Sequence, residues 1–153
     1  MIIPKMPAYL TSLGGAEYKG LIISLFTITA MISRPFSGKI ADKVGRIPVM
    51  IIGTAVCVFI SLLYPILSSV AGFLFLRLIH GFSTGFTPTG LTAYLSDIIP
   101  YNKRGEAMGL LGTAGTVGMA AGLAVGPGIA NDFGLNVMFY CSSATAVISI
   151  AVL

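Results

Sequence analysis

The stretch RPFSGKIADKVGRIPVM, residues 34–50, lies between two long apolar segments and concentrates the charge of this chain. It holds four basic residues and a single acid, Asp42, whereas only 9% of the 153 residues are charged and 56% are hydrophobic. A soluble domain carries roughly 25% charged residues, so this chain has too few to cover a surface that faces water. The composition therefore predicts an integral membrane protein with a polar turn at residues 39–46.

The apolar runs on either side of this turn are close to 20 residues long and do not alternate with polar residues, which predicts helices rather than strands. We expect an all-α polytopic membrane protein with spans at about 20–40, 47–67, 70–99, 107–130 and 137–153. Residues 1–19, interrupted by Pro4 and Pro7, are expected to be the outer end of an earlier helix followed by a loop. The last run ends without a polar flank, so we expect the chain to be part of a longer protein.

Loop charges predict the orientation. One side of the predicted membrane carries five cations and the other side two, which are respectively Lys39, Lys43, Arg46, Lys103 and Arg104, against Lys5 and Lys19. Cytoplasmic loops are enriched in lysine and arginine. We therefore expect loops 39–46 and 101–106 in the cytoplasm, with the protein in a bacterial inner membrane. Because the cations mark the ends of spans, the net charge of +4 does not indicate nucleic-acid binding.

The charged turn has a recognisable spacing, G-x-x-x-D-K-x-G-R, formed by Gly38, Asp42, Lys43, Gly45 and Arg46. It resembles the loop between the second and third helices of the major facilitator superfamily. The resemblance implies a partial six-helix bundle, with helices two to six and the end of helix one. Those residues would then form a conformational switch loop.

Two later motifs occur in the order expected for that superfamily. RLIHGFSTG, with Arg77, Gly81 and Gly85, is similar to its fourth-helix motif, and GLAVGPGIAN, with Gly122, Gly126 and Pro127, is similar to the fifth-helix motif of its antiporter branch. The glycine pair that usually follows the proline is replaced here by Ala130 and Asn131. This departure makes the resemblance to the antiporter branch weaker than the resemblance to the superfamily.

The resemblance implies a secondary active transporter that moves a small solute by alternating access, with a proton-coupled exporter as the first interpretation. A facilitator or importer of the same fold, for sugars or other metabolites, is the alternative within the family. A non-transporting membrane sensor or assembly subunit is the alternative outside it. The expected partners are the solute, the bilayer and a C-terminal helical half of the same chain, with the proton as coupling ion and no other cofactor.

Three groups of residues are candidates for this function. Asp42 lies at the negative end of its helix dipole and needs a partner. Arg46 at i+4 is one candidate, and the helix that begins near Pro48 or the N-terminus of a facing helix is another. Asp97 and Arg104 are expected to form a cytoplasmic charge network close to Arg46. Arg77 is too deep to be a topology signal, and a cavity position is the default for such a charge. We expect it to line the transport path with the remaining members of its group, His80, Gly81, Gly85 and Arg34. For His80 the alternative is a packed core residue, and for Arg34 it is snorkelling to the interface.

The third group is a glycine stripe on the predicted fifth helix. Gly115, Gly118, Gly122 and Gly126 fall within about 80° of one another at 100° per residue. Together with Pro127 they predict either close helix packing or a pivot for conformational change. Cys57 and Cys141 are expected to be packing residues, and the sequence contains no spacing typical of a metal site or of an enzyme active site.

Overall fold

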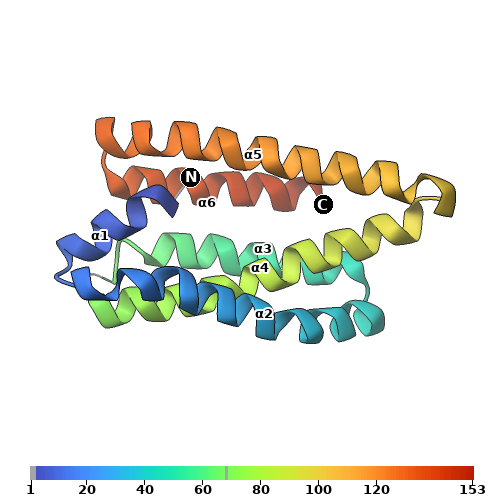
Figure 1. Cartoon of the computed structure of the whole chain (residues 1–153), viewed down its shortest axis with the longest axis horizontal. Helices are drawn as coiled ribbons and strands as arrows, with labels where there is room; N and C mark the ends of the chain where they lie inside the picture. The colour runs from blue at the N-terminus through green and yellow to red at the C-terminus, as the bar shows by residue number, and fades with distance from the viewer. Residues whose placement is uncertain (1–2, 68) are drawn as a thin grey trace.

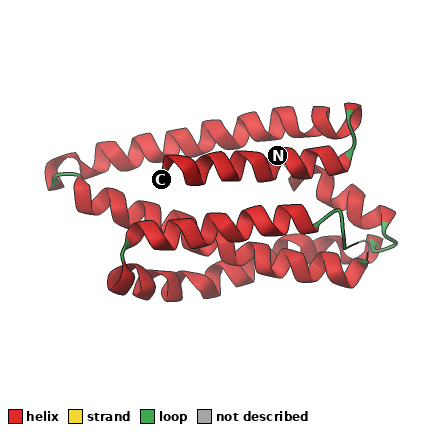
Figure 2. Cartoon of the chain, turned by 180° about the vertical axis from the view of Figure 1, so that it is seen from behind, coloured by secondary structure: helices red, strands yellow, loops and turns green. Residues whose placement is uncertain are grey.

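A computed structural model describes residues 3–67 and 69–153, and nearly all of them are helical, with no strand in these two ranges (Figure 2). The elements in chain order are η1 (Ile3–Lys5), α1 (Met6–Ser12), η2 (Ala16–Tyr18), α2 (Lys19–Val44), α3 (Arg46–Leu63), α4 (Val70–Ile98), η3 (Tyr101–Lys103), α5 (Arg104–Asp132) and α6 (Leu135–Val152). Five of the helices are long and apolar enough to cross a membrane.

The long helices run roughly along a common direction in two groups (Figure 1). Helix α4 packs against both α2 and α3, and α3 also packs against α6. Helix α5, in orange, lies beside α6, and the short α1 lies at the end of the bundle where α2 begins. The long connection between α4 and α5 is at the opposite end, around η3.

The first polar turn is shorter than the sequence predicted. Helix α2 continues through Lys43 and Val44, and the chain changes direction at Gly45, whose φ of 110° is in a region that favours glycine. Most of the predicted loop 39–46 is therefore the last turn of a helix, and α3 begins at once with Arg46.

The end of α3 also differs from the expected span. The helix stops at Leu63 rather than near residue 67, because Pro65 has no backbone N–H with which to extend the hydrogen-bond ladder. Of the predicted turn at 68–69, Ser68 lies outside the described residues, and Ser69 caps α4 by accepting a hydrogen bond from the Gly72 N–H at 3.1 Å.

Aromatic residues hold four helices together at the end of the bundle that carries α1. Tyr64 stacks on Phe139 of α6 with ring centroids 5.1 Å apart and contacts Phe73 of α4. The Tyr9 hydroxyl of α1 donates a hydrogen bond to the Tyr64 carbonyl at 3.1 Å. This cluster fixes α1 against α3, α4 and α6.

Large apolar side chains also cover the outside of the helices. Ile23, Met31, Phe59 and Leu110, on three different long helices, are each more than half exposed. Exposed apolar surface on this scale is unfavourable in water and favourable in hydrocarbon. The protein is an integral membrane protein, and a surface of this kind suits a hydrocarbon environment.

Candidate functional site

Arg46 is at the centre of the charged turn. Its Nη1 donates a hydrogen bond to the Ala41 carbonyl at 2.7 Å. The same carbonyl also accepts a hydrogen bond from the Gly45 N–H. Arg46 therefore adds a second donor to a carbonyl in the last turn of α2. Its Nη2 lies 3.3 Å from Asp42 Oδ1, at the i+4 spacing expected from the sequence.

A second acid reaches the same guanidinium from another helix. Asp97, in the last turn of α4, places Oδ2 at 2.7 Å from Arg46 Nε. A close approach of α4 to α3 makes this possible, because a Cβ atom on Gly90 would lie 3.0 Å from the Arg46 carbonyl. Arg46 therefore connects the end of α2, the start of α3 and the end of α4. We call Arg46, Asp42 and Asp97 the charge latch.

The two acids of the charge latch are exposed, whereas Arg46 is partly buried, with 27% of its side chain exposed. The side chain of Asp42 is 74% exposed and that of Asp97 is 53% exposed. Exposed ion pairs contribute roughly 0.2–1 kcal/mol each. A stabilisation of that size does not explain the fold, but it is enough to bias an equilibrium between two conformations of similar free energy.

The other residues of the predicted switch and network lie around the latch without joining it. Lys43 is exposed, and a Cβ on Gly38 would meet no atom within 4 Å in the part of the chain that the structure describes. Arg104 donates from Nε to the Ile99 carbonyl at 3.3 Å and lies over the Tyr101 ring. Arg46, rather than Arg104, is thus the ion-pair partner of Asp97 in the described residues.

Arg77 is buried between two helices, and its predicted role on the transport path stays a prediction. It is 3% exposed, its Nε donates to the Ile22 carbonyl at 3.2 Å, and its guanidinium lies 4.5 Å from the centroid of the Phe26 ring. A carbonyl oxygen and an aromatic face both stabilise a cation. Both partners are on α2, so Arg77 joins α4 to α2.

Gly81 and Gly85 continue the same interface, and their predicted place on the transport path stays a prediction. A Cβ on Gly81 would collide with the Phe26 carbonyl, and one on Gly85 would collide with Ser33 and lie 2.8 Å from the Ala30 carbonyl. The Ser37 hydroxyl donates to the Gly85 carbonyl at 2.8 Å. These small residues let two helix backbones approach closely.

The open face of α4 is the adjacent one, which carries His80. His80 lies between Tyr64 and Cys57, with Nδ1 3.3 Å from the Tyr64 hydroxyl and Nε2 3.7 Å from Cys57 Sγ. It borders a cavity of about 370 Å³ between α3, α4 and α6. Seven of the lining side chains carry hydroxyl groups, namely Thr54, Ser83, Thr84, Thr87, Ser142, Thr145 and Ser149.

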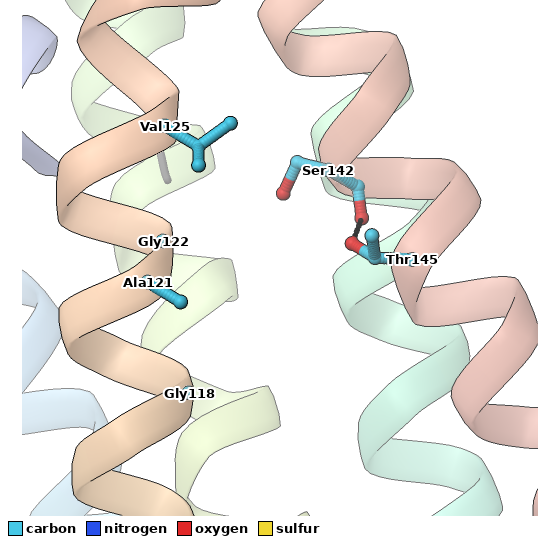
Figure 3. A pocket seen from close by; sticks show the side chains of 6 residues that line it. All are labelled: Gly118, Ala121, Gly122, Val125, Ser142 and Thr145. Atoms are coloured by element: carbon cyan, nitrogen blue, oxygen red, sulfur yellow. Dashed lines mark hydrogen bonds between the residues drawn. The ribbon is translucent and has the colours of Figure 1, made fainter.

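A second cavity, of about 410 Å³, separates α5 from α6 (Figure 3). Gly118 and Gly122 line it on α5, opposite Ser142 and Thr145 of α6, and those two α6 residues also border the first cavity. A Cβ on Gly115 or Gly118 would meet no atom within 4 Å among residues 3–67 and 69–153. At these positions the predicted glycine stripe faces open space, so close packing does not account for it within the described residues.

The C-terminal end of the glycine stripe, at Gly126, is buried rather than open. Gly126 is the one buried residue of α5, all of which the structure describes. The helix continues through Pro127 to Asp132. Whether this segment acts as a pivot stays a prediction.

Arg34 is exposed on α2 and borders a separate pocket of about 260 Å³ with Pro88, Thr89 and Thr92 of α4. The structure thus separates the predicted path residues into three places. Arg77 and the two glycines are in the α2–α4 interface, His80 is at the hydroxyl-lined cavity, and Arg34 is at this pocket.

Sequence reasoning missed several residues of these sites. Gly53 and Gly90 set the close approach of α3 to α4, and Tyr64 and Cys57 flank His80. A glycine within an apolar span was the available signal for the first pair. No sequence signal linked the second pair to His80.

The charge latch, the tightly packed α2–α4 pair and the polar cavities lie on a scaffold that is similar to known proteins. The sequence profile of the Major Facilitator Superfamily matches residues 1–153. The chain is 32% identical over 151 residues to multidrug resistance protein 2 of Bacillus subtilis. This alignment covers 97% of the chain and 37% of the Bacillus protein.

Other relatives match over similar lengths. The multi-drug resistance efflux pump PmrA of Streptococcus pneumoniae is 35% identical over 145 residues, covering 91% of this chain and 36% of the pump. The multidrug resistance protein MdtG of a Rahnella strain is 33% identical over 150 residues, and the alignment covers 94% of this chain and 36% of MdtG. The chain spans little more than a third of the length of these curated relatives. With the profile matching every residue, the chain belongs to the Major Facilitator Superfamily.

Proposed function

We propose that the full-length protein exports a small solute as a secondary active transporter, and that its charge latch controls alternating access from the cytoplasmic side. The observation that carries this proposal is the position of Arg46, which holds the ends of α2 and α4 at the first residue of α3. A contact among helix ends, outside the packed core, can break and re-form without unfolding the bundle.

The direction of transport rests on the relatives. Two of the matching proteins are named as multidrug resistance proteins and one as a multi-drug efflux pump. Export of a small solute is therefore favoured over import or facilitated diffusion. The hydroxyl-lined cavity beside His80 supplies neutral polar groups that can contact such a solute.

The coupling ion is proposed to be the proton. The five acids of the chain are Glu17, Asp42, Asp97, Glu106 and Asp132, and each lies near an end of a long helix. A proton-binding carboxyl group within the membrane is therefore expected in another part of the full-length protein. His80 has a thiol and a phenol as neighbours, which supports its alternative role as a packed residue.

We place the latch in the cytoplasm of a bacterium, with the protein in the inner membrane. The lysine and arginine excess of loops 39–46 and 101–106 supports this orientation, as do the bacterial relatives. The remaining partners are the lipid bilayer and a C-terminal helical half of the same chain.

The test is solute flux in proteoliposomes that contain the purified full-length protein. Vesicles with an imposed proton gradient are loaded with fluorescent multidrug-pump dyes of cationic and zwitterionic type. We expect the gradient to drive dye movement, and Asp42→Asn, which keeps the shape of the side chain and removes its charge, to slow it severely with nearly normal expression. Glu106→Gln is the matched control, because it removes a cytoplasmic acid that has no ion pair within 4.0 Å in the described residues.

Each outcome distinguishes one interpretation. Flux that is independent of the gradient identifies a facilitator, and flux in the inward direction identifies an importer. No flux of any dye, from protein that is folded and correctly oriented, favours a sensor or assembly subunit. Equal transport by Asp42→Asn and Glu106→Gln would show that Asp42 is only a topology residue.

A further inference from the structure

We propose that Cys57 and His80 form a binding site for a zinc-group divalent cation, Zn²⁺ or Cd²⁺, at the cavity between α3, α4 and α6. The proposal does not depend on the transport function. It rests on the separation of two metal-binding atoms, on the partner of the second imidazole nitrogen, and on the space beside them.

The first observation is the distance between the two ligand atoms. Cys57 Sγ lies 3.7 Å from His80 Nε2. Zinc bonds of about 2.3 Å to sulfur and about 2.05 Å to nitrogen, at a tetrahedral angle, place these atoms about 3.6 Å apart. The two side chains are thus already spaced as adjacent ligands of one ion, although they come from different helices.

The second observation is the environment of the other imidazole nitrogen. His80 Nδ1 lies 3.3 Å from the Tyr64 hydroxyl. A histidine that binds a metal almost always donates its other N–H to a neighbouring acceptor, which fixes the tautomer and the orientation of the ring. With the proton on Nδ1, His80 donates to Tyr64 and presents the Nε2 lone pair toward Cys57.

The third observation is room for the remaining ligands. Cys57 and His80 both border the hydroxyl-lined cavity of about 370 Å³. This volume accommodates the one or two waters that complete a four-coordinate ion. No cluster of three or more His, Cys, Asp or Glu side chains occurs in the described residues, so the site would have two protein ligands with water in the other positions.

Coordination at this site has a defined proton balance. The ligand forms are thiolate and neutral imidazole, so the thiol gives up its proton when the metal–sulfur bond forms. That proton passes to water or buffer. No oxidation or reduction takes place, because both ions have filled d shells. The bound ion would link α3 to α4.

The experiment titrates Cd²⁺ into the purified, reduced full-length protein in detergent and follows the ultraviolet absorption of the cadmium–thiolate bond, with Zn²⁺ as competitor. We expect a saturable step that Cys57→Ser removes. Cys141→Ser, the matched control on α6, should retain it. His80→Gln should weaken binding more than tenfold, and Tyr64→Phe should weaken it about 10- to 100-fold through loss of the hydrogen bond to the ring.

A measurement on the unmutated protein covers the case in which a variant does not fold. Release of about one proton for each ion bound at Cys57 is expected, and absence of that release overturns the proposal. Persistence of the step in Cys57→Ser overturns it as well. Unchanged affinity in folded His80→Gln shows that the thiol alone binds cadmium and excludes the two-ligand site.

Discussion

Replacing Gly81 with alanine should separate α2 from α4. The added Cβ would collide with the Phe26 carbonyl oxygen and would lie 3.0 Å from the carbonyl carbon and Cα of the same residue. All of these atoms belong to the backbone of α2, so no side-chain rotation relieves the contact. One turn earlier, the Arg77 Nε bond to the Ile22 carbonyl at 3.2 Å depends on the same spacing.

Two opposing contributions set the magnitude. Alanine is more favourable than glycine within a helix by about 1 kcal/mol. Overpacking of a tight contact costs typically 1–3 kcal/mol. The contact at Gly81 is with rigid backbone, so the upper part of that range applies and the expected net destabilisation is about 2 kcal/mol.

Gly118→Ala is the matched control. Gly118 also lies within a long helix, but its added Cβ would meet no atom of the described residues within 4 Å. Only the propensity contribution remains there, so this variant should be stabilised by up to about 1 kcal/mol. The two substitutions are chemically identical and should change stability in opposite directions.

Thermal unfolding of the purified full-length protein, followed with a dye that reacts with newly exposed thiols, measures the effect. Cys57 is a suitable reporter because it lies between α3 and α4 beside His80. We expect a lower unfolding temperature for Gly81→Ala and an equal or higher one for Gly118→Ala. Equal unfolding temperatures for the two variants would refute the close contact between α2 and α4.

Two further predictions concern orientation and Arg77. Cysteines introduced at Val44 and Asn102, in a background without Cys57 and Cys141, should resist an impermeant thiol reagent added outside intact cells, and rapid labelling would reverse the topology. Arg77→Ala should lower thermal stability and transport together, with Arg77→Lys intermediate because it keeps the charge but loses the planar fork; loss of transport at unchanged stability would instead place Arg77 on the solute path.

The sequence was informative wherever local geometry decides the structure. Five apolar segments indicated the long helices, and the i+4 spacing of Asp42 and Arg46 indicated their contact, because positions four apart on a helix are neighbours. Pro65 was also an available signal, and it explains why α3 ends earlier than expected.

The sequence could not decide what a face of small residues contacts. Gly81 and Gly85 are buried against α2, whereas Gly118 and Gly122 border a cavity. In the first case glycine allows close approach of two helices, and in the second the described residues leave space beside it. The choice depends on the neighbouring helix, which periodicity within one helix does not specify.

Contacts among helices were likewise beyond the sequence. Cys57, Tyr64 and His80 occupy unrelated positions along the chain and meet because α3 packs against α4. Each residue alone reads as a core side chain. Only the packing shows that the thiol and phenol flank opposite nitrogens of one imidazole.

The central claim is that Arg46 and Asp97 act as one unit in transport. The most direct measurement is a double-mutant cycle on flux in proteoliposomes, with Arg46→Gln, Asp97→Asn and the two combined in the full-length protein. Residues that share one interaction have non-additive effects. We predict that each single substitution slows transport severely and that the double variant is no slower than the slower single variant. Multiplying effects, or normal transport by either single variant, would contradict the latch.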